Sequence, residues 1–284
     1  MKILVTGATG FIGNNVVSEL LKNNCQVIAT SLNMEKAKAA SWFSQVKYIP
    51  FDLKNFDDGT NYYSFFGEPD AMIHLAWEGL PNYKDAFHLQ ENLPRHLAFL
   101  TNLISNGLTN LTVTGTCFEY GMKEGCLSEE MVCEPANPYA IAKNELHIQL
   151  QQLNANKLFN FKWIRLFYMY GQGQSVKSLI SQLETALENN EPQFNMSAGE
   201  QVRDFLPVEE VAANIVKIGL QNKVQGIINC CSGNPVTVKA FVENYLKKKN
   251  KSIKLNLGYY PYADYEPMKF WGDTNKFKLI KSND

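Results

Sequence analysis

The sequence predicts an α/β fold in which a doubly wound parallel sheet carries a small C-terminal substrate lobe. Short apolar runs alternate with segments of helical spacing, which predicts parallel strands joined by right-handed crossover helices. The runs lack strict alternation of apolar and polar residues, as is typical of strands buried on both faces of a sheet. A glycine-rich turn after the first run supports the same class, and the second half is less regular.

The predicted elements follow one another regularly as far as Tyr170. The predicted strands are Lys2–Thr6, Gln26–Thr30, Val46–Phe51, Ala71–Ala76, Leu111–Thr116, Phe161–Phe167 and Gly226–Cys231. The predicted helices are Phe11–Lys22, Asp85–Ser105, Pro138–Asn154, Ser178–Glu188, Val208–Leu220 and Thr237–Lys249. Residues 189–207 are expected to form a loop, and the aromatic tail 259–284 is expected to be irregular. We therefore expect a sheet domain over 1–171 plus about 205–232, and a lobe from 172–204 and 233–284.

Composition excludes several classes of partner. Hydrophobic residues make up 45% of the 284 residues, enough for a sizeable core, and the formal net charge is −1. This balance gives no reason to expect nucleic acid or an anionic membrane as a partner, and no apolar run is long enough to span a bilayer. The six cysteines form no C-x-x-C pair and no two histidines lie at i, i+4 spacing, so no metal site is expected. Since no secretory signal precedes the first strand-like run, we expect a cytoplasmic protein with reduced thiols.

The glycine-rich turn reads Thr6-Gly7-Ala8-Thr9-Gly10-Phe11-Ile12-Gly13 and lies between a predicted strand and a predicted helix. Gly7 permits the tight turn, Gly10 lets the backbone approach a pyrophosphate, and Gly13 allows close packing of helix on strand. The free N–H groups at the helix N-terminus would then face the phosphates. The alternative, a glycine-rich turn without a ligand, is disfavoured by this position in the chain.

Tyr139 and Lys143 form a Y-x-x-x-K pair, and on a helix their spacing places both side chains on one face. A tyrosine is rarely ionised near neutral pH, but a nearby ammonium stabilises the phenolate and lowers the pKa. Tyr139 could then exchange a proton with a carbinol or carbonyl oxygen. The alternative is a surface pair without function, which the glycine motif in the same chain disfavours.

With Thr6 before it, the glycine motif resembles the T-G-x-x-G-x-x-G signature of extended short-chain dehydrogenases/reductases. Other segments that match this family are Asp52-Leu53, His74-Leu75-Ala76 with Trp77 in place of a second alanine, Arg203-Asp204-Phe205 with Val208, and Asp273-Thr274-Asn275-Lys276. The resemblance implies a Rossmann domain that binds a nicotinamide cofactor, with the catalytic lysine on the nicotinamide ribose. The cofactor-binding residues so implied are Gly7, Thr9, Gly10, Phe11, Ile12, Gly13, Ser31, Asp52, Leu53, Leu75, Ala76, Tyr139 and Lys143.

A third catalytic residue is expected at a strand end, where the family pattern is S/T-x-x-x-Y-G. Counting back from Tyr120 gives Thr116, whose hydroxyl would hydrogen-bond the substrate oxygen; Thr114 is the alternative. Related dehydratases carry an Asp-Glu pair after this threonine, whereas this chain has Cys117 and Phe118, so dehydration is disfavoured. Cys117 is expected to contact substrate as a buried thiol, with a role as acid or base as the alternative.

Cofactor choice depends on the end of the second predicted strand, where enzymes that use NAD place an acidic residue on the ribose hydroxyls. This chain has Ser31 and Asn33 there, with Lys36 and Lys38 following, and no carboxylate to repel a 2′-phosphate. We therefore expect NADP(H), with NAD as the alternative. The two lysines could equally be solvated helix residues.

The resemblance also indicates a substrate class. Tyr168 replaces an Asn that contacts substrate in many epimerases and dehydratases, and with the segment around Thr116 it makes the chain similar to bacterial reductases of nucleotide-linked 4-keto-6-deoxysugars, such as CDP-abequose synthase and the reductase that makes dTDP-D-fucose. Arg203 would clamp the pyrophosphate of the substrate through parallel hydrogen bonds, or else pair at the surface with Glu200 or Glu209.

We expect NADPH-dependent reduction of a dTDP- or CDP-linked 4-keto-6-deoxyhexose to a donor for surface polysaccharide. The alternatives are a nucleotide-sugar 4-epimerase with tightly held NAD and a non-catalytic NAD(P)-binding regulator; the missing acidic residue disfavours the first, and the intact Thr116–Tyr139–Lys143 set disfavours the second. The family often forms dimers through two helices beside the sheet, so a homodimer through Asp85–Ser105 and Pro138–Asn154 is expected.

Overall fold

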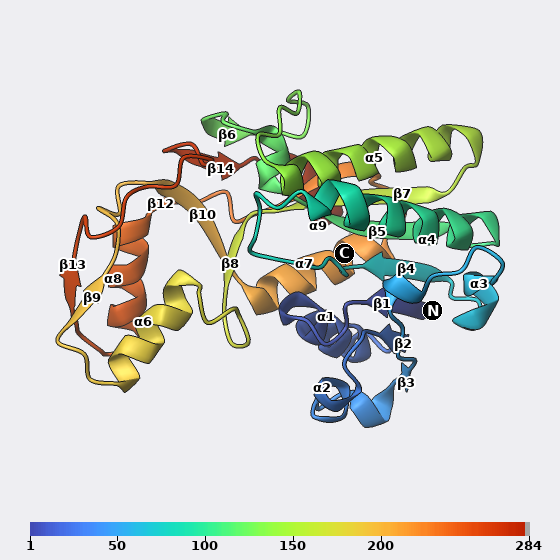
Figure 1. Ribbon diagram of the computed structural model, residues 1–284, viewed down its shortest axis with the longest axis horizontal. Coiled ribbons are helices and arrows are strands. Elements are labelled where there is room, and N and C mark those ends of the chain that lie inside the picture. The colour runs from blue at the N-terminus through green and yellow to red at the C-terminus, as the bar shows by residue number, and fades with distance from the viewer. Residues whose placement is uncertain (282–284) are drawn as a thin grey trace.

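A seven-stranded parallel sheet forms the centre of the molecule in this computed structural model, which describes residues 1–281 (Figure 1). Its strand order is β11-β7-β5-β4-β1-β2-β3. The strands are β1 Lys2–Thr6, β2 Gln26–Thr30, β3 Lys47–Tyr48, β4 Ala71–His74, β5 Asn110–Thr116, β7 Asn160–Leu166 and β11 Gly226–Cys230. Because the chain turns outward in opposite directions from β1 and β4, a crevice for ligands opens at their carboxyl ends.

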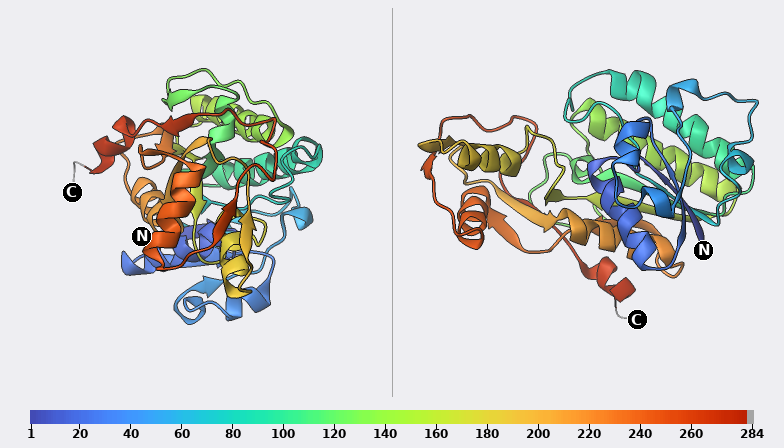
Figure 2. Two further views of the ribbon diagram at one scale, coloured as in Figure 1. Left: turned by 90° about the vertical axis from the view of Figure 1, so that its left-hand side faces the viewer. Right: turned by 90° about the horizontal axis from the view of Figure 1, so that it is seen from below.

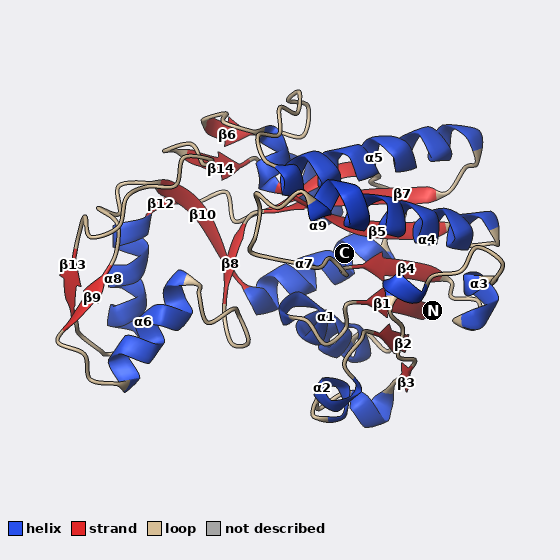
Figure 3. Cartoon of the chain, in the orientation of Figure 1, coloured by secondary structure: helices blue, strands red, loops and turns tan. Residues whose placement is uncertain are grey.

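Helices cover both faces of this sheet (Figure 3). On one face lie α1 (Phe11–Lys22) and α7 (Val208–Leu220), which pack on each other; on the other lie α4 (Leu93–Ser105) and α5 (Pro138–Asn156), which do the same. Each pair of helices buries an apolar stripe in its own core cluster. The doubly wound α/β fold expected from the sequence is therefore confirmed.

A small lobe lies beyond the carboxyl ends of the strands and has an apolar core of its own (Figure 2). It contains α6 (Leu179–Glu188), α8 (Val238–Lys248) and the strand pair β9 (Gln193–Asn195) and β13 (Lys254–Asn256). A second sheet connects the lobe to the domain through β8 (Tyr168–Tyr170), β10 (Val202–Pro207) and β12 (Pro235–Thr237). The expectation of a loop over 189–207 was wrong, since β9 and β10 are strands whose partners lie far away in the sequence.

The tail is also more regular than the sequence indicated. After β13, strand β14 (Phe270–Gly272) pairs in parallel with β6 (Gly125–Leu127), and α9 (Asn275–Lys281) follows. Phe277 and Ile280 of α9 are buried in the core of the main sheet, so α9 packs against that domain. The remaining short helices are α2 Met34–Lys38, α3 Tyr62–Phe65, η1 Phe43–Gln45, η2 Leu53–Asn55, η3 His88–Asn92 and η4 Cys117–Tyr120.

Residues 1–281 contain neither a membrane-spanning helix nor a cluster of metal ligands. None of the helices described is long and apolar enough to cross a membrane. Within the same residues, no three acidic, histidine or cysteine side chains come together as ligands for a metal ion.

Candidate active site

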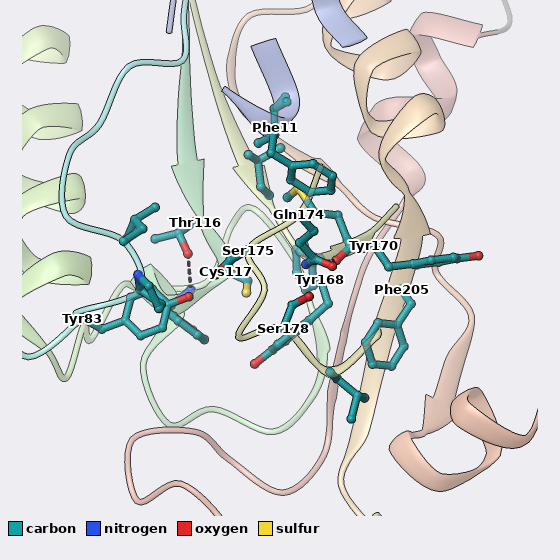
Figure 4. Close-up of a pocket in the computed structure, with 18 of the residues that line it drawn as sticks. Phe11, Tyr83, Thr116, Cys117, Tyr168, Tyr170, Gln174, Ser175, Ser178 and Phe205 are labelled. Atoms are coloured by element: carbon teal, nitrogen blue, oxygen red, sulfur yellow. Dashed lines mark hydrogen bonds between the residues drawn. The ribbon is translucent and has the colours of Figure 1, made fainter. Parts of the chain in front are cut away.

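A cavity of about 730 Å³ lies between the carboxyl edge of the main sheet and the small lobe. Figure 4 shows its two walls: Thr116 and Cys117 on the side of the sheet, and Tyr170 and Phe205 on the side of the lobe. The glycine turn lies at one end of the cavity, and Glu266 from the tail contributes to its wall. This is the place that the strand order predicts for a ligand.

The glycine turn has the geometry that a dinucleotide phosphate requires. Gly7 has φ +67°, a conformation that side chains rarely adopt, and its carbonyl accepts a hydrogen bond from Gly10 N at 2.9 Å. A Cβ on Gly13 would overlap the carbonyl oxygen of Gly7, so only glycine lets α1 pack this closely. Gly10 caps α1 without a side-chain hydrogen bond, and the first residues of the helix line the cavity. These residues fit the pyrophosphate of a nicotinamide dinucleotide.

The other residues expected to bind cofactor divide into two groups. Those that line the cavity are Gly7, Gly10, Phe11, Ile12, Gly13, Leu75, Tyr139 and Lys143. Among the residues that the structure describes, those absent from its wall are Thr9, Ser31, Asp52, Leu53 and Ala76. The Ser31 hydroxyl is hydrogen-bonded to Thr9 Oγ1 at 2.8 Å and Tyr48 Oη at 2.9 Å, and Asp52 accepts from Lys54 N at 2.9 Å.

Tyr139 and Lys143 lie in the first turns of α5, which Asn137 begins by accepting a hydrogen bond from Ala140 N. Lys143 Nζ donates to the carbonyl of Thr114 at 2.8 Å and lies 4.1 Å from the centre of the Trp77 ring. Burial lowers the pKa of Lys143 to about 7, with the charge of Glu119 acting in the opposite direction. The expectation that Lys143 lowers the pKa of Tyr139 was wrong, because burial raises this pKa above its ordinary value and the phenol stays protonated near neutral pH.

Thr116 ends β5 and begins the short helix η4. Its hydroxyl accepts a hydrogen bond from Phe118 N at 3.3 Å, drawn as a dashed line in Figure 4. The same hydroxyl lies close enough to Tyr139 to oppose in part the rise in its pKa that burial causes. The alternative residue, Thr114, donates its hydroxyl to the carbonyl of His74 at 3.3 Å. Thr116 is therefore the threonine whose hydroxyl lies with Tyr139.

A buried ion pair behind Thr116 was not expected from the sequence. Glu119 Oε1 accepts from Thr116 N at 2.8 Å, and Glu119 Oε2 accepts from Arg165 Nε at 2.8 Å and Trp163 Nε1 at 3.0 Å. The side chains of Glu119 and Arg165 are both fully buried. Through the bond to Thr116 N, the ion pair holds the end of β5 in place. The spacing T-x-x-E from Thr116 to Glu119, a capping box, is the signal that could have found it.

Cys117 lies in the wall of the cavity, where its predicted contact with substrate stays a prediction. It is 5% exposed, and burial raises the pKa of its thiol strongly, with the charge of Glu266 as the next cause. A thiol that rarely ionises is a poor general base. This environment therefore favours the buried neutral thiol over the alternative of an acid or base.

Arg203 is not a surface residue and does not pair with Glu200 or Glu209. It lies on β10, is 1% exposed, and its Nη2 donates to Glu266 Oε2 at 2.9 Å. Its Nη1 donates to the carbonyls of Val202 and Met268, so a bidentate clamp on a pyrophosphate would compete with these internal bonds. No local pattern in the sequence points to Glu266, because the tail brings it there.

Known proteins are similar to this chain over most of its length. The family model described as the NAD dependent epimerase/dehydratase family matches residues 3–231. The dTDP-6-deoxy-L-talose 4-dehydrogenase (NAD(+)) of Aggregatibacter actinomycetemcomitans is 30% identical over 96% of this chain and 99% of its own. The GDP-6-deoxy-D-talose 4-dehydrogenase of the same organism is 25% identical over 100% of this chain and 92% of its own.

Solved structures show the same fold at lower identity. The UDP-N-acetylglucosamine 4-epimerase from Methanobrevibacter ruminantium M1, in complex with UDP-N-acetylmuramic acid, superposes with a TM-score of 0.85 at 22% identity, over 98% of this chain and 91% of that one. The UDP-glucuronic acid 4-epimerase from Bacillus cereus, in complex with UDP-glucuronic acid and NAD, gives 0.84 at 22% identity, over 99% and 93%. These neighbours establish that the Rossmann-type architecture is shared.

Proposed function

The chain belongs to the NAD-dependent epimerase/dehydratase family, and from that premise we propose that it reduces the 4-keto group of a nucleotide diphosphate 4-keto-6-deoxyhexose, dTDP- or CDP-linked, with NADPH. One observation carries the proposal. Thr116, Tyr139 and Lys143 line one cavity together with the glycine turn, so a carbonyl, a proton donor and a dinucleotide can meet there. The product would be a 6-deoxysugar nucleotide for surface polysaccharide.

The two relatives from Aggregatibacter support the substrate class. Both are named as 4-dehydrogenases of a 6-deoxytalose linked to a nucleoside diphosphate. Reduction of a 4-ketone is the reverse of the oxidation of a carbon-4 alcohol, so one active site can catalyse both. The first relative also covers nearly the whole chain, which means that the lobe and the tail have counterparts there.

The chain's own residues provide the proton chemistry. A bound nicotinamide would supply the hydride to carbon 4. Tyr139, protonated near neutral pH because burial raises its pKa, donates its proton to the carbon-4 oxygen, while the Thr116 hydroxyl hydrogen-bonds the same oxygen. The Lys143 ammonium stabilises the phenolate left behind until solvent returns a proton. The sugar gains one hydride and one proton and becomes the alcohol.

The cofactor preference follows from the end of β2. Ser31 stands where an acidic residue would repel a 2′-phosphate, which supports NADP(H), although the first relative is named for NAD(+). We expect NADPH to give a higher kcat/KM than NADH, and Ser31→Asp to move the ratio toward NADH by charge repulsion. Steady-state assays with both cofactors measure this. A wild-type preference for NADH would leave the reductase proposal standing with NAD as its cofactor.

A nucleotide-sugar 4-epimerase with tightly held NAD is the second candidate, and the two solved neighbours named as 4-epimerases favour it. Such an enzyme returns the hydride to the same sugar and shows no net redox change. The purified protein separates the two candidates, because an epimerase retains the absorbance of its cofactor whereas a reductase exchanges it with solution.

The proposal is tested by turnover of 4-keto-6-deoxysugars linked to dTDP, CDP, GDP and UDP, with oxidation of NADPH as the signal. We expect one linkage to be preferred and the free keto sugar to be a poor substrate, since binding of the nucleotide positions carbon 4. Equal kcat/KM for the linked and the free sugar would reduce the protein to a general carbonyl reductase.

We further propose a cytoplasmic homodimer that forms through α4 and α5. Ile141 and Ile148, two turns apart on α5, are 39% and 37% exposed, which supports an apolar contact along that helix. Light scattering on the purified protein would then give twice the mass of one chain.

A further inference from the structure

The wall of the cavity contains a hydrogen-bonded group that the proposed mechanism does not use: Glu266, Arg203 and Tyr168. Tyr168 Oη donates to Glu266 Oε2 at 2.6 Å, and Arg203 Nη2 donates to the same oxygen at 2.9 Å. Glu266 Oε1 accepts no hydrogen bond from any of the described residues. The carboxylate is therefore held firmly on one side and has an oxygen left for a group inside the cavity.

The two charges of this group do not face the cavity equally. The side chain of Glu266 is 15% exposed, whereas that of Arg203 is 2% exposed. The guanidinium is also withdrawn behind the carboxylate, since its Nη1 bonds the carbonyls of Val202 and Met268 and its centre lies 4.6 Å from the Phe270 ring. A molecule in the cavity meets the negative partner first.

The carboxylate also lies near residues that adjoin the proposed catalytic set. Burial is the main cause of the raised pKa of Cys117, and the charge of Glu266 comes next, ahead of the opposing charge of Arg203. The raised pKa of Tyr83 is likewise due first to burial and Tyr265, with a further contribution from Glu266. Cys117 follows Thr116 in the chain, and the Tyr83 ring centre is 5.5 Å from that of Tyr139. Glu266 thus lines the same cavity as Thr116 and Tyr139 and lies near their immediate neighbours.

We infer that Glu266, held by Arg203 and Tyr168, determines substrate specificity by excluding nucleotide sugars with a carboxylate at carbon 6. The inference rests on the proposed function, because the sugar must occupy this cavity with carbon 4 at Tyr139 and Thr116. Carbon 6 is two bonds from carbon 4, so its substituents enter the same space. A second carboxylate there is repelled at low dielectric, whereas a methyl or hydroxymethyl group is not, and a hydroxyl can donate to Oε1.

Binding of two probes that differ only at carbon 6 tests the inference. Calorimetry on the full chain saturated with NADP+ gives Kd for glucose and for glucuronic acid, both linked to dTDP or both linked to CDP, whichever linkage supports turnover. In the wild type we expect the uronic acid to bind at least about tenfold more weakly, the scale of one uncompensated charge contact. In Glu266→Gln the ratio should fall to one or below, because the charge of Arg203 remains. The ratio should stay at the wild-type value in Glu200→Gln, which changes an exposed carboxylate outside the cavity wall.

A second variant keeps the test valid if Glu266→Gln does not fold around its unpaired arginine. Glu266→Gln combined with Arg203→Gln removes both charges, and the ratio should then be close to one. Equal affinities in the wild type, or a wild-type ratio in the double variant, would overturn the inference while leaving the proposed function intact. If neither probe binds the wild type at millimolar concentration, the nucleotide-sugar assignment and the inference fail together.

Discussion

Two arginine–glutamate pairs lie near the cavity: Glu119–Arg165 behind Thr116, and Glu266–Arg203 in the cavity wall, called the lobe pair below. The first supports the local structure, whereas the second can select the substrate. In the main domain, the side chains of Glu119 and Arg165 are fully buried, and the arginine lies 4.3 Å from the Tyr120 ring. At the lobe, Arg203 is also nearly buried and lies on an aromatic ring, but the side chain of Glu266 is 15% exposed. The first carboxylate bonds the backbone of Thr116, and the second faces the cavity.

A fully buried pair can support a neighbouring side chain, while a partly exposed pair can also recognise a ligand. All oxygens of Glu119 are used by Thr116, Trp163 and Arg165, so the pair has no capacity left for substrate. Removing one partner leaves the other as an uncompensated buried charge. At the lobe the carboxylate lines the cavity, so water can take its place beside Arg203 and the cost of losing the carboxylate is lower.

Glu119→Ala gives the largest expected effect. It leaves Arg165 buried without a counter-ion and frees the backbone of Thr116, so the free energy of unfolding should fall by about 3–5 kcal/mol. Urea denaturation without cofactor measures the loss. Glu266→Ala is the matched variant at the other pair and should lose less, about 1–2 kcal/mol. Equal losses at the two sites would contradict the distinction between them.

Tyr139→Phe tests the proposed proton donor and leaves both arginine–glutamate pairs unchanged. The variant keeps the ring but removes the proton donor, so kcat should fall at least about a hundredfold. Affinity for NADPH, measured by fluorescence titration, should stay close to the wild-type value, because the phenol is not the main anchor of the cofactor. Near-normal turnover would remove Tyr139 from the mechanism.

The sequence was sufficient for the main sheet because its signals are local. Strands β1 and β2 and helices α1 and α7 have the predicted bounds, and the spacing of the glycine turn and of Tyr139 and Lys143 needs only one turn of chain. The pair of Arg203 and Glu266 could not be predicted from the sequence, because it depends on contacts between distant segments. Arg203 and Glu266 are 63 residues apart and meet only because β10 and the tail fold over the same cavity. Strand β10 was also missed, since its partners β8 and β12 are distant.

Arg203→Ala tests the lobe pair through kinetics. The change leaves the charge of Glu266 without its partner, so an anionic nucleotide sugar should be repelled, and KM should rise by about tenfold. The loss in kcat should be smaller, since Tyr139 and Lys143 are untouched. Arg203→Lys keeps a cation and should recover part of the affinity. A fall in kcat with unchanged KM would mean that the lobe pair acts on the chemical step.

The pH dependence of cofactor binding tests whether Lys143, whose pKa the charge of Glu119 influences, binds the cofactor as an ammonium. Burial lowers the pKa of Lys143 to about 7, and Glu119 opposes this. The ammonium, present below that pKa, attracts the anionic dinucleotide, so affinity should be level below pH 7 and fall above it by up to about tenfold per pH unit. The control is Lys162→Met, since burial lowers the pKa of Lys162 to about 8 but it bonds Asn110 away from the cavity wall. If Lys162→Met removes the pH dependence, Lys143 is not its source.

Transfer of deuterium is the most direct test of reduction at carbon 4. The enzyme would be supplied with NADPH deuterated on the transferred position of the nicotinamide, and with a dTDP- or CDP-linked 4-keto-6-deoxyhexose. The account predicts one deuterium at carbon 4 of the product, by mass spectrometry and NMR, with one cofactor oxidised per sugar reduced. A product without deuterium and without net oxidation of cofactor would contradict the reductase and favour an epimerase.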